Sequence, residues 1–194
     1  MTGASLLPIV GKETENEKPR DFVVLARERH AFVRQEGLGY PGRAIRTQDF
    51  LYIKNYEASR WPGGDPPLYG DVDPYMLNYP GPAKFYILKN KDNPKVKPMF
   101  DLAFAKRPTE ELFDVVNDPD QLRNLANDPK YKSVKEELAG KMIAYLVETN
   151  DPRETGGKII WDNTDYFSEI DKTPKPSKEA IKIFGLDTMY NYLK

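Results

Sequence analysis

The sequence of 194 residues carries 29 basic and 30 acidic side chains, a formal net charge of −1, and no cysteine. This length fits one soluble globular unit, and the near balance of charge gives no reason to expect nucleic acid or an anionic membrane as a partner. The lack of cysteine excludes disulfides, thiolate metal sites and a cysteine nucleophile, and it leaves the redox compartment undetermined. We expect no export signal and no membrane span, because the apolar stretch Leu6 to Val10 is short and follows no cationic segment.

Two strand regions are predicted in the first third of the chain. The run FVVLA, Phe22 to Ala26, is continuously apolar, which is typical of a strand buried on both faces. No comparable run lies nearby, so part of its sheet is expected outside these residues. The segment around 43–56 predicts an antiparallel hairpin with one covered and one wetter face. Leu51, Ile53 and Asn55 would share one of those faces.

A long excursion is predicted next. Residues Glu57 to Lys106 are dense in Pro, Gly and Tyr, and proline is excluded from helix interiors and from central strands. Excursions of this length are more often functional lids or packed meanders than idle connectors. Within it, Phe85 to Leu88 is a candidate for a further strand.

The stretch ELFDVVNDPDQLRNLANDPKY, Glu111 to Tyr131, predicts a short strand followed by two helical starts, at Asp118-Pro119 and at Asp128-Pro129. Ser133 with Glu136 has the form of a capping box for a helix over 133–149. The residues of that helix that recur at helical spacing, and that should be buried on the covered face of the hairpin, are Val134, Leu138, Met142, Tyr145, Leu146 and Thr149. Beyond Pro152 we expect a polar tail with a short helix from Ser177 to Phe184.

The expected fold class is therefore α+β, a small antiparallel sheet of about four strands packed by one long amphipathic helix. The long Pro/Gly/Tyr-rich loop excursion should cover an edge of this sheet.

The order of strand, Asp-Pro turn, Asn-Leu-Ala and helix resembles the ELYDL…DP.E..NLA…P.Y signature that ends sulfatases of the alkaline-phosphatase-like superfamily. The matching segments are Glu111 to Asp114, Asp118-Pro119, Asn124 to Ala126, and Pro129 with Tyr131, with Phe for Tyr and Gln for Glu. The segments TGASLLPIVGK, RERH, GYPGRAIRTQDFLYIKNY and RWPGGDP are also similar to this family, closest to its heparan N-sulfatase (sulfamidase) branch. The resemblance covers Thr2 to about Arg153.

This resemblance implies three parts. Residues 1–40 would be the tail end of the sulfatase catalytic domain with strand 22–26 and a crossover loop, 41–152 the C-terminal sulfatase subdomain, and 153–194 a surface-wrapping extension. Such sulfatases use a formylglycine made from Cys or Ser in a C/S-x-P/A-x-R motif, together with calcium. Both are expected in an N-terminal domain outside this chain, because no serine here has that motif. We therefore assign no catalytic residue, cofactor or metal site to this chain, and WDNTD, Trp161 to Asp165, lies in a polar tail rather than at a strand end.

The substrate-binding candidates are His30, Arg27, Arg29, Arg34 and Trp61. The resemblance implies that the loop with His30 lines the substrate pocket, and arginine forks suit sulfate oxygens. A solvated basic loop is the alternative, and for Trp61 a loop anchor rather than a sugar-stacking ring. For Arg43 and Arg46 we favour cross-strand pairing with Asp49 or Glu57.

The sequence therefore predicts the C-terminal fragment of a sulfatase that hydrolyses sulfuric esters or sulfamates on sulfated glycans. The fragment would brace the N-terminal catalytic domain, contribute to the substrate pocket and be inactive alone. Its expected partners are that domain and the glycan, and the family implies a periplasmic or extracellular location. The alternative is a module without catalysis, either one that binds sulfated glycan by itself or one that forms a homo-oligomer by pairing the strand at 22–26 between chains.

Overall fold

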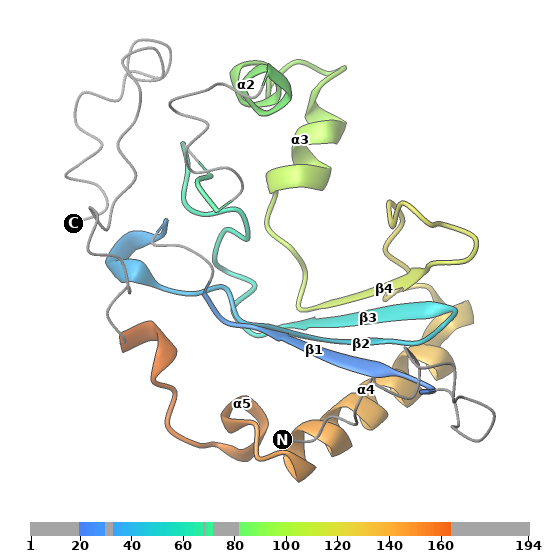
Figure 1. Cartoon of the computed structure of the whole chain (residues 1–194). Coiled ribbons are helices and arrows are strands. Elements are labelled where there is room, and N and C mark those ends of the chain that lie inside the picture. The colour runs from blue at the N-terminus through green and yellow to red at the C-terminus, as the bar shows by residue number, and fades with distance from the viewer. Residues whose placement is uncertain (1–19, 30–32, 68, 72–81, 164–194) are drawn as a thin grey trace, which may run out of the picture.

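The computed structural model of the protein describes residues 20–29, 33–67, 69–71 and 82–163. Within these residues, strands β1 (Val23–Arg27), β2 (Gly42–Arg46), β3 (Phe50–Asn55) and β4 (Glu110–Asp114) form one antiparallel sheet in the order β1-β2-β3-β4 (Figure 1). The predicted small antiparallel sheet with its hairpin is thereby confirmed. Alternate side chains of each strand point to opposite faces, so each face of the sheet has its own set of side chains.

One face of the sheet is covered by helix α4 (Lys132–Glu148), as predicted (Figure 1). Leu138, Met142 and Leu146 are the buried residues of the helix, and their spacing of four residues places them on one stripe. They join a single cluster with residues of β2, β3 and β4, namely Ile45, Tyr52 and Leu112. This cluster is the main hydrophobic core.

The start of α4 differs from the prediction. The side chain of Asp128 accepts a hydrogen bond from the backbone N–H of Lys130 and begins the 3₁₀ turn η4 (Pro129–Tyr131), which runs directly into α4. The predicted cap at Ser133 is wrong, because α4 begins at Lys132 and no side chain caps it. The Asp-Pro pair supplies both a side-chain acceptor and a preset backbone φ, so it starts the helical segment one turn early.

The Asn-Leu-Ala tripeptide closes the outer edge of β4. The side-chain oxygen of Asn124 accepts hydrogen bonds from the backbone N–H groups of Leu112, at 3.0 Å, and of Ala126, at 2.9 Å. The N–H of Leu125 donates to the carbonyl of Leu112 at 2.8 Å, and Leu125 and Ala126 enter the core. The predicted helical start at Asp118 is instead a turn, in which its carboxylate accepts from the N–H of Arg123. The chain thus returns along β4 and leaves no open edge there.

Two other predictions are corrected. Among the described residues, strand β1 pairs only with β2, and Val23 and Leu25 are exposed, so it is not buried on both faces. The excursion is not all loop, because it contains α2 (Pro82–Lys89) and α3 (Lys97–Phe104). The candidate strand Phe85 to Leu88 lies inside α2. Proline or glycine does not interrupt either helix after its first turn, so both segments are long enough to be helical.

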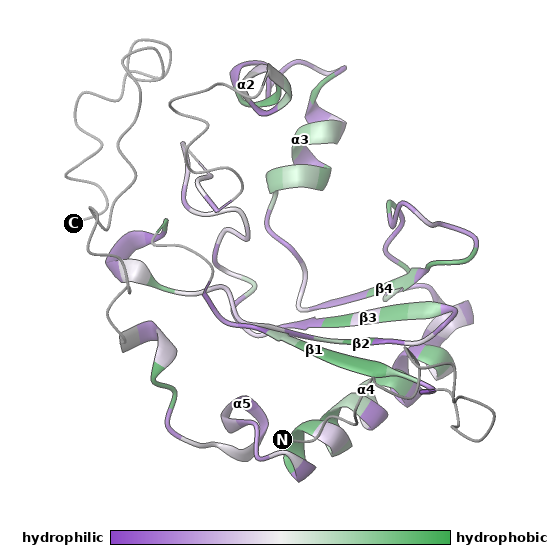
Figure 2. Cartoon of the chain, in the orientation of Figure 1, coloured by the Kyte–Doolittle hydropathy of each residue, from purple (hydrophilic) through white to green (hydrophobic). Residues whose placement is uncertain are grey.

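The excursion has a small hydrophobic cluster of its own. Tyr69, Leu88 and Phe104 are its buried members, and Trp61 packs against them. Figure 2 shows apolar residues along β1 and on α3, on the side of the sheet away from α4. The remaining described elements are short: η2 (Gln35–Gly37), α5 (Pro152–Thr155) and η5 (Trp161–Asn163).

Some expectations concern residues or boundaries that stay untested. The helix predicted from Ser177 to Phe184 lies outside the described residues. The division at residues 40 and 152 stays a prediction, although β1 and β2 belong to one sheet. Among the described helices, none has the length and apolarity to cross a membrane.

The core predicts a clear stability difference between two positions of α4. Met142→Ala should lower the free energy of unfolding by about 2–5 kcal/mol, because Met142 is fully buried and its loss leaves a cavity. Val147→Ala, at a position that is 49% exposed, should change it by less than about 0.5 kcal/mol. Urea unfolding followed by circular dichroism measures both, and equal effects would contradict the packing of α4 on the sheet.

Candidate functional site

The face of the sheet opposite α4 is the open face, and it is predominantly apolar. Its central row consists of Leu25, Ala44, Ile53 and Glu111, which are cross-strand neighbours. Leu25 is 52% exposed, and the exposed side chains of Leu102 and Leu122 flank the same face, because they line a pocket with Ile53. Exposed apolar residues that gather on one face mark a surface that another molecule covers.

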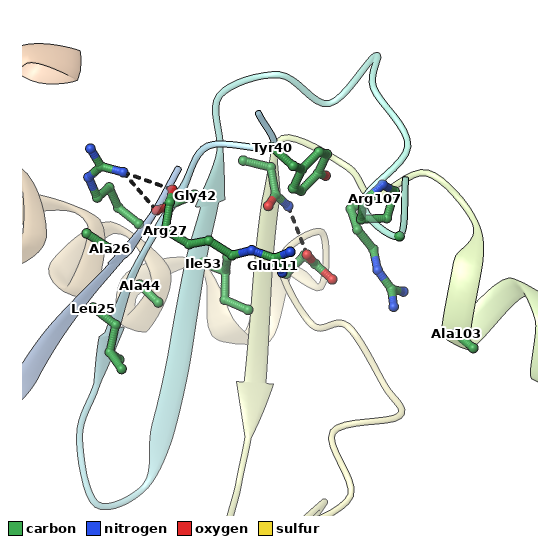
Figure 3. Close-up of a pocket in the computed structure, with 14 residues that line it drawn as sticks. Leu25, Ala26, Arg27, Tyr40, Gly42, Ala44, Ile53, Ala103, Arg107 and Glu111 are labelled. Atoms are coloured by element: carbon green, nitrogen blue, oxygen red, sulfur yellow. Dashed lines mark hydrogen bonds between the residues drawn. The ribbon is translucent and has the colours of Figure 1, made fainter. Parts of the chain in front are cut away.

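Two adjoining pockets hollow the open face. The first, the Tyr40 pocket, has a volume of about 500 Å³ and lies between β1–β3 and the excursion (Figure 3). The second has about 450 Å³ and lies between the end of α3 and the turn at 120–124. Ile53, Arg107 and Glu111 line both pockets, so the two pockets are neighbours that share these walls. The Tyr40 pocket has mostly apolar walls, as is typical of small-ligand sites, whereas the second pocket is lined about equally by polar and apolar groups.

Six polar side chains line the Tyr40 pocket: Arg27, Tyr40, Arg43, Asn55, Arg107 and Glu111. Arg27 ends β1, Tyr40 precedes β2, Asn55 ends β3 and Arg107 precedes β4. The amide of Asn55 donates to the buried carboxylate of Glu111 at 2.8 Å and to the carbonyl of Pro108, also at 2.8 Å. Glu111 is therefore held within the sheet by Asn55.

Arg43, which also lines the pocket, is a buried guanidinium with a full set of partners. Its Nε and Nη2 donate to the carboxylate of Asp151 at 2.8 and 3.2 Å, and Nη2 also donates to Glu28 at 2.7 Å. Its Nη1 donates to the carbonyls of Arg27, at 3.3 Å, and Gly42, at 3.0 Å. Burial acts to lower the pKa of Arg43, but the hydrogen bonds and charges of Asp151 and Glu28 outweigh it, so the pKa is raised. The predicted pairing of Arg43 with Asp49 or Glu57 is wrong.

Arg34 is equally buried, at 2% exposure, but its partners are incomplete. Its Nε donates to the carbonyl of Trp61 at 2.8 Å, and its Nη2 donates to the carbonyl of Pro62 at 2.6 Å and to Asp71 at 3.0 Å. Its Nη1 has no hydrogen-bond partner. Burial lowers the pKa of Arg34, and the hydrogen bond and charge of Asp71 only partly offset this effect.

Tyr40 is the second buried group without a partner. Its hydroxyl makes no hydrogen bond, and the guanidinium carbon of Arg34 lies 5.7 Å from the centre of its ring. Burial, reinforced by the charge of Glu111, raises the pKa of Tyr40 to about 12, against the opposing charges of Arg107, Arg34 and Arg27. The phenol thus stays protonated near neutral pH and is able to donate a hydrogen bond.

The predicted substrate-binding residues differ in their positions and in their hydrogen-bond partners. Arg27 lines the pocket and pairs with Asp71, and its side chain is 51% exposed. Arg29 donates to the carbonyl of Gly37 at 3.0 Å, and Arg34 lies behind the pocket. His30 lies outside the described residues. Their role in binding substrate stays a prediction.

Trp61 belongs to the excursion cluster rather than to the pocket lining. Its ring meets that of Tyr69 edge to face, with centroids 5.5 Å apart, and the ammonium of Lys106 lies 5.2 Å from its centre. These contacts fit the loop-anchor alternative.

Sequence reasoning did not single out Tyr40, Asn55, Arg107 and Glu111. Asn55 carried a signal, because a polar residue on the same face as Leu51 and Ile53 has to find a partner. Glu111 begins the quoted sulfatase-like motif and is a buried strand residue. Arg107 gave no signal, because only the fold brings it to the open face.

The described residues contain no group of three or more His, Cys, Asp or Glu side chains arranged to hold a metal ion. Asp162 of the WDNTD segment instead accepts a hydrogen bond from the N–H of Gly39 at 2.8 Å and pairs with Arg60 at 3.3 Å.

Sequence comparison shows which known proteins this chain resembles. No protein-family model matches the chain. An ulvan-active sulfatase of Formosa agariphila is 28% identical over 153 residues, which cover 78% of this chain and 25% of that protein. A second ulvan-active sulfatase of the same organism is 32% identical over 109 residues, or 56% of this chain and 17% of that protein.

Human N-sulphoglucosamine sulphohydrolase is 24% identical over 166 residues, covering 78% of this chain and 27% of that protein. The resemblance to the C-terminal portion of the sulfatase family is therefore confirmed. The chain spans at most about a quarter of the length of these curated relatives. A solved 2-O GAG sulfatase gives a TM-score of 0.45 at 18% identity, covering 89% of this chain and 27% of that one, which is too low to support a functional assignment.

The buried Arg43 site predicts a large effect of a conservative substitution. Arg43→Lys should lower the free energy of unfolding by about 2–4 kcal/mol, because an ammonium cannot serve the two carboxylates and the two carbonyls together. Arg123→Lys, at a side chain that is 77% exposed, should have an effect below about 0.5 kcal/mol. Thermal and urea unfolding measure both variants, and a stable Arg43→Lys would show that the guanidinium does not join these segments.

Proposed function

We propose that this chain serves as the C-terminal portion of a sulfatase, where it braces the catalytic domain and supplies part of the substrate pocket. The observation that carries the proposal is the two-sided sheet. Helix α4 covers one face, whereas the opposite face is apolar, partly exposed and hollowed by two pockets. A partner that makes up the remaining length of the sulfatase relatives is the occupant we assign to that face.

In this proposal the chain does not hydrolyse sulfate esters or sulfamates by itself. Cleavage of a sulfate ester or sulfamate needs a nucleophile, charge stabilisation at the sulfonate oxygens and a proton donor for the leaving group. No cysteine is present, and no serine has the sulfatase nucleophile motif. Formylglycine and calcium therefore belong to the catalytic domain in this proposal, and this chain contributes binding and support.

In this proposal, the substrate class is inferred from the sulfatase relatives. Their names specify activity on ulvan and on N-sulphoglucosamine, so we assign a sulfated glycan to the complete enzyme. Both sulfate-ester and sulfamate hydrolysis are compatible with this class. The location that accompanies it is periplasmic or extracellular.

One observation favours a second candidate function. No described segment pairs with the outer edge of β1, and Val23 and Leu25 are exposed on this strand. An exposed edge strand is able to pair with another copy of itself, so a homodimerisation module is the alternative. Light scattering of the purified chain distinguishes the two, because the bracing function needs no dimer.

The docking assignment predicts the effect of two matched double variants. The catalytic partner is first identified by searching the DNA beside this coding sequence for a reading frame with the C/S-x-P/A-x-R motif, and the two polypeptides are then purified together. Val23→Glu with Leu25→Glu should weaken their association at least about tenfold, because charge on the open face opposes burial. Ile143→Glu with Val147→Glu, at exposed positions of α4, should leave it unchanged.

Activity supplies the second measurement. The 194-residue chain alone should not turn over an aryl sulfate, and the complex should. Turnover by the chain alone, or equal association of both double variants, would refute the proposed function.

A further inference from the structure

Helix α3 has apolar side chains on two of its sides. Phe100 and Phe104 form the inner stripe and pack on Tyr69, with ring centroids 5.7 and 5.4 Å from that of Tyr69. Met99 and Leu102 lie on another side, where both are exposed, and form the outer stripe. Residues three or four positions apart share one side of a helix, so the two stripes are separate.

The charged residues of α3 lie on a third side. Lys97 and Asp101, four residues apart, form an ion pair with an Nζ to Oδ2 distance of 2.6 Å. Ala103 is exposed and, four residues after Met99, extends the outer stripe. A surface helix normally has one apolar stripe toward the core, whereas a helix with further apolar sides is covered there as well. The outer stripe therefore indicates a second body that packs on α3.

The outer stripe is continuous with the open face of the sheet. Ala103 lines the Tyr40 pocket together with Leu25 and Ile53, and Figure 3 shows it at the end of that pocket away from Leu25. Leu102 lines the second pocket together with Ile53. Helix α3 and the sheet are thus two walls of the same pair of pockets, so a molecule that covers the open face also meets α3.

The second pocket has the form of an anchor site for a protein partner. Its apolar lining comes from α3, from the sheet and from the turn at 120–124, through Leu102, Ile53, Phe113 and Leu122. Its polar lining includes three residues of that turn, Asp120, Gln121 and Asn124. At protein interfaces, an apolar site with polar groups around it is where one large side chain of the partner contributes much of the binding energy.

The catalytic domain of the proposed sulfatase is the occupant that the observations favour. This chain covers about a quarter of the length of the sulfatase relatives, so most of such a protein lies outside it. The alternative homodimer would pair β1 at one edge of the described sheet, whereas the second pocket lies by β4 at the other edge. Pairing at β1 therefore does not account for the outer stripe.

We propose that α3 is a docking helix for the catalytic domain, which places an apolar side chain in the second pocket between Leu102 and Leu122. The proposal rests on the proposed sulfatase function, because that function supplies the partner. It adds a contact outside the sheet, in which α3 lies between the excursion cluster on its inner side and the catalytic domain on its outer side. The excursion thus has a role in docking as well as in the fold.

Substitution of the outer stripe tests the docking helix in the complex of the two polypeptides. Met99→Glu with Leu102→Glu should weaken their association at least about tenfold, because the contact would bury two carboxylates in an apolar surface. Lys97→Ala with Asp101→Ala, on the charged side of α3, should leave the association unchanged. None of these four side chains is buried, so circular dichroism should show the same fold for every free variant. Equal association of the two double variants would refute the docking helix.

A charge-neutral variant separates apolar contact from long-range repulsion. Met99→Ala with Leu102→Ala removes most of the outer stripe without adding charge, so it should also weaken the association, by a smaller factor. Full association of this variant, together with weak association of the glutamate variant, would show charge repulsion instead of contact and overturn the proposal.

Methionine oxidation tests the same contact in the unsubstituted chain. In the free chain treated with hydrogen peroxide, Met99, at 55% exposure, should form the sulfoxide rapidly, whereas the fully buried Met142 of α4 should react slowly. In the complex, Met99 should react at least about fivefold more slowly, because the partner covers its sulfur. Mass spectrometry of the two peptides measures both residues in one sample, so Met142 is the internal control.

The other occupants of the outer stripe give different oxidation patterns. Protection of Met99 that rises with the concentration of the free chain would assign the stripe to a second copy. Protection at every concentration would assign it to another part of this chain, such as residues 164–194. Either pattern overturns the proposal.

Failure of the docking helix and failure of the sulfatase function are distinguishable. If the complex forms and turns over substrate, but Met99 reacts equally fast in the free chain and in the complex, the function stands and α3 lies outside the interface. If no complex forms, the sulfatase function fails, and the docking helix fails with it.

Discussion

The buried guanidinium of Arg43 holds together parts of the chain that the hydrophobic core does not reach. Its hydrogen bonds connect the start of β2, the end of β1 and the segment after α4, and Asp151 is 108 residues away in sequence. Arg153 completes the arrangement, because its Nη2 donates to Glu28 at 2.7 Å. Two buried positive charges are thereby matched by two carboxylates, and every N–H of Arg43 has an acceptor, which is the condition under which a buried ion pair is tolerated.

The contrast with Arg34 distinguishes a structural group from one with an incomplete environment. Both guanidiniums are almost fully buried, but burial lowers the pKa of Arg34, whereas that of Arg43 is raised by its partners. An unpaired polar group that is buried destabilises a fold, because it has lost its hydrogen bonds to water. Among the described residues, Arg34 Nη1 carries that cost, whereas every N–H of Arg43 is satisfied.

Much of the fold could be predicted because its signals are local. The hairpin around 43–56 and the apolar spacing of Leu138, Met142 and Leu146 depend on periods of two and four residues. The edge position of β1 could not be predicted, since an apolar run does not reveal how many neighbours a strand has. Helices α2 and α3 were not predicted, because they lie within an excursion that is rich in proline and glycine, and this composition indicates loop.

Only part of the candidate site could be predicted, because most of its residues carry no local sequence pattern. Arg27 was identified through its place in a recognisable motif, but Arg107 is a single charged residue between α3 and β4 with no pattern around it. Tyr40 lay within a quoted motif and gave no sign that its hydroxyl would be unpaired. A buried group is recognised as unpaired only when the positions of all its neighbours are known. The structure supplies these positions, and sequence periodicity does not. The covered face of the sheet contains the core that stabilises the fold, and the open face is the surface that we propose a catalytic partner covers.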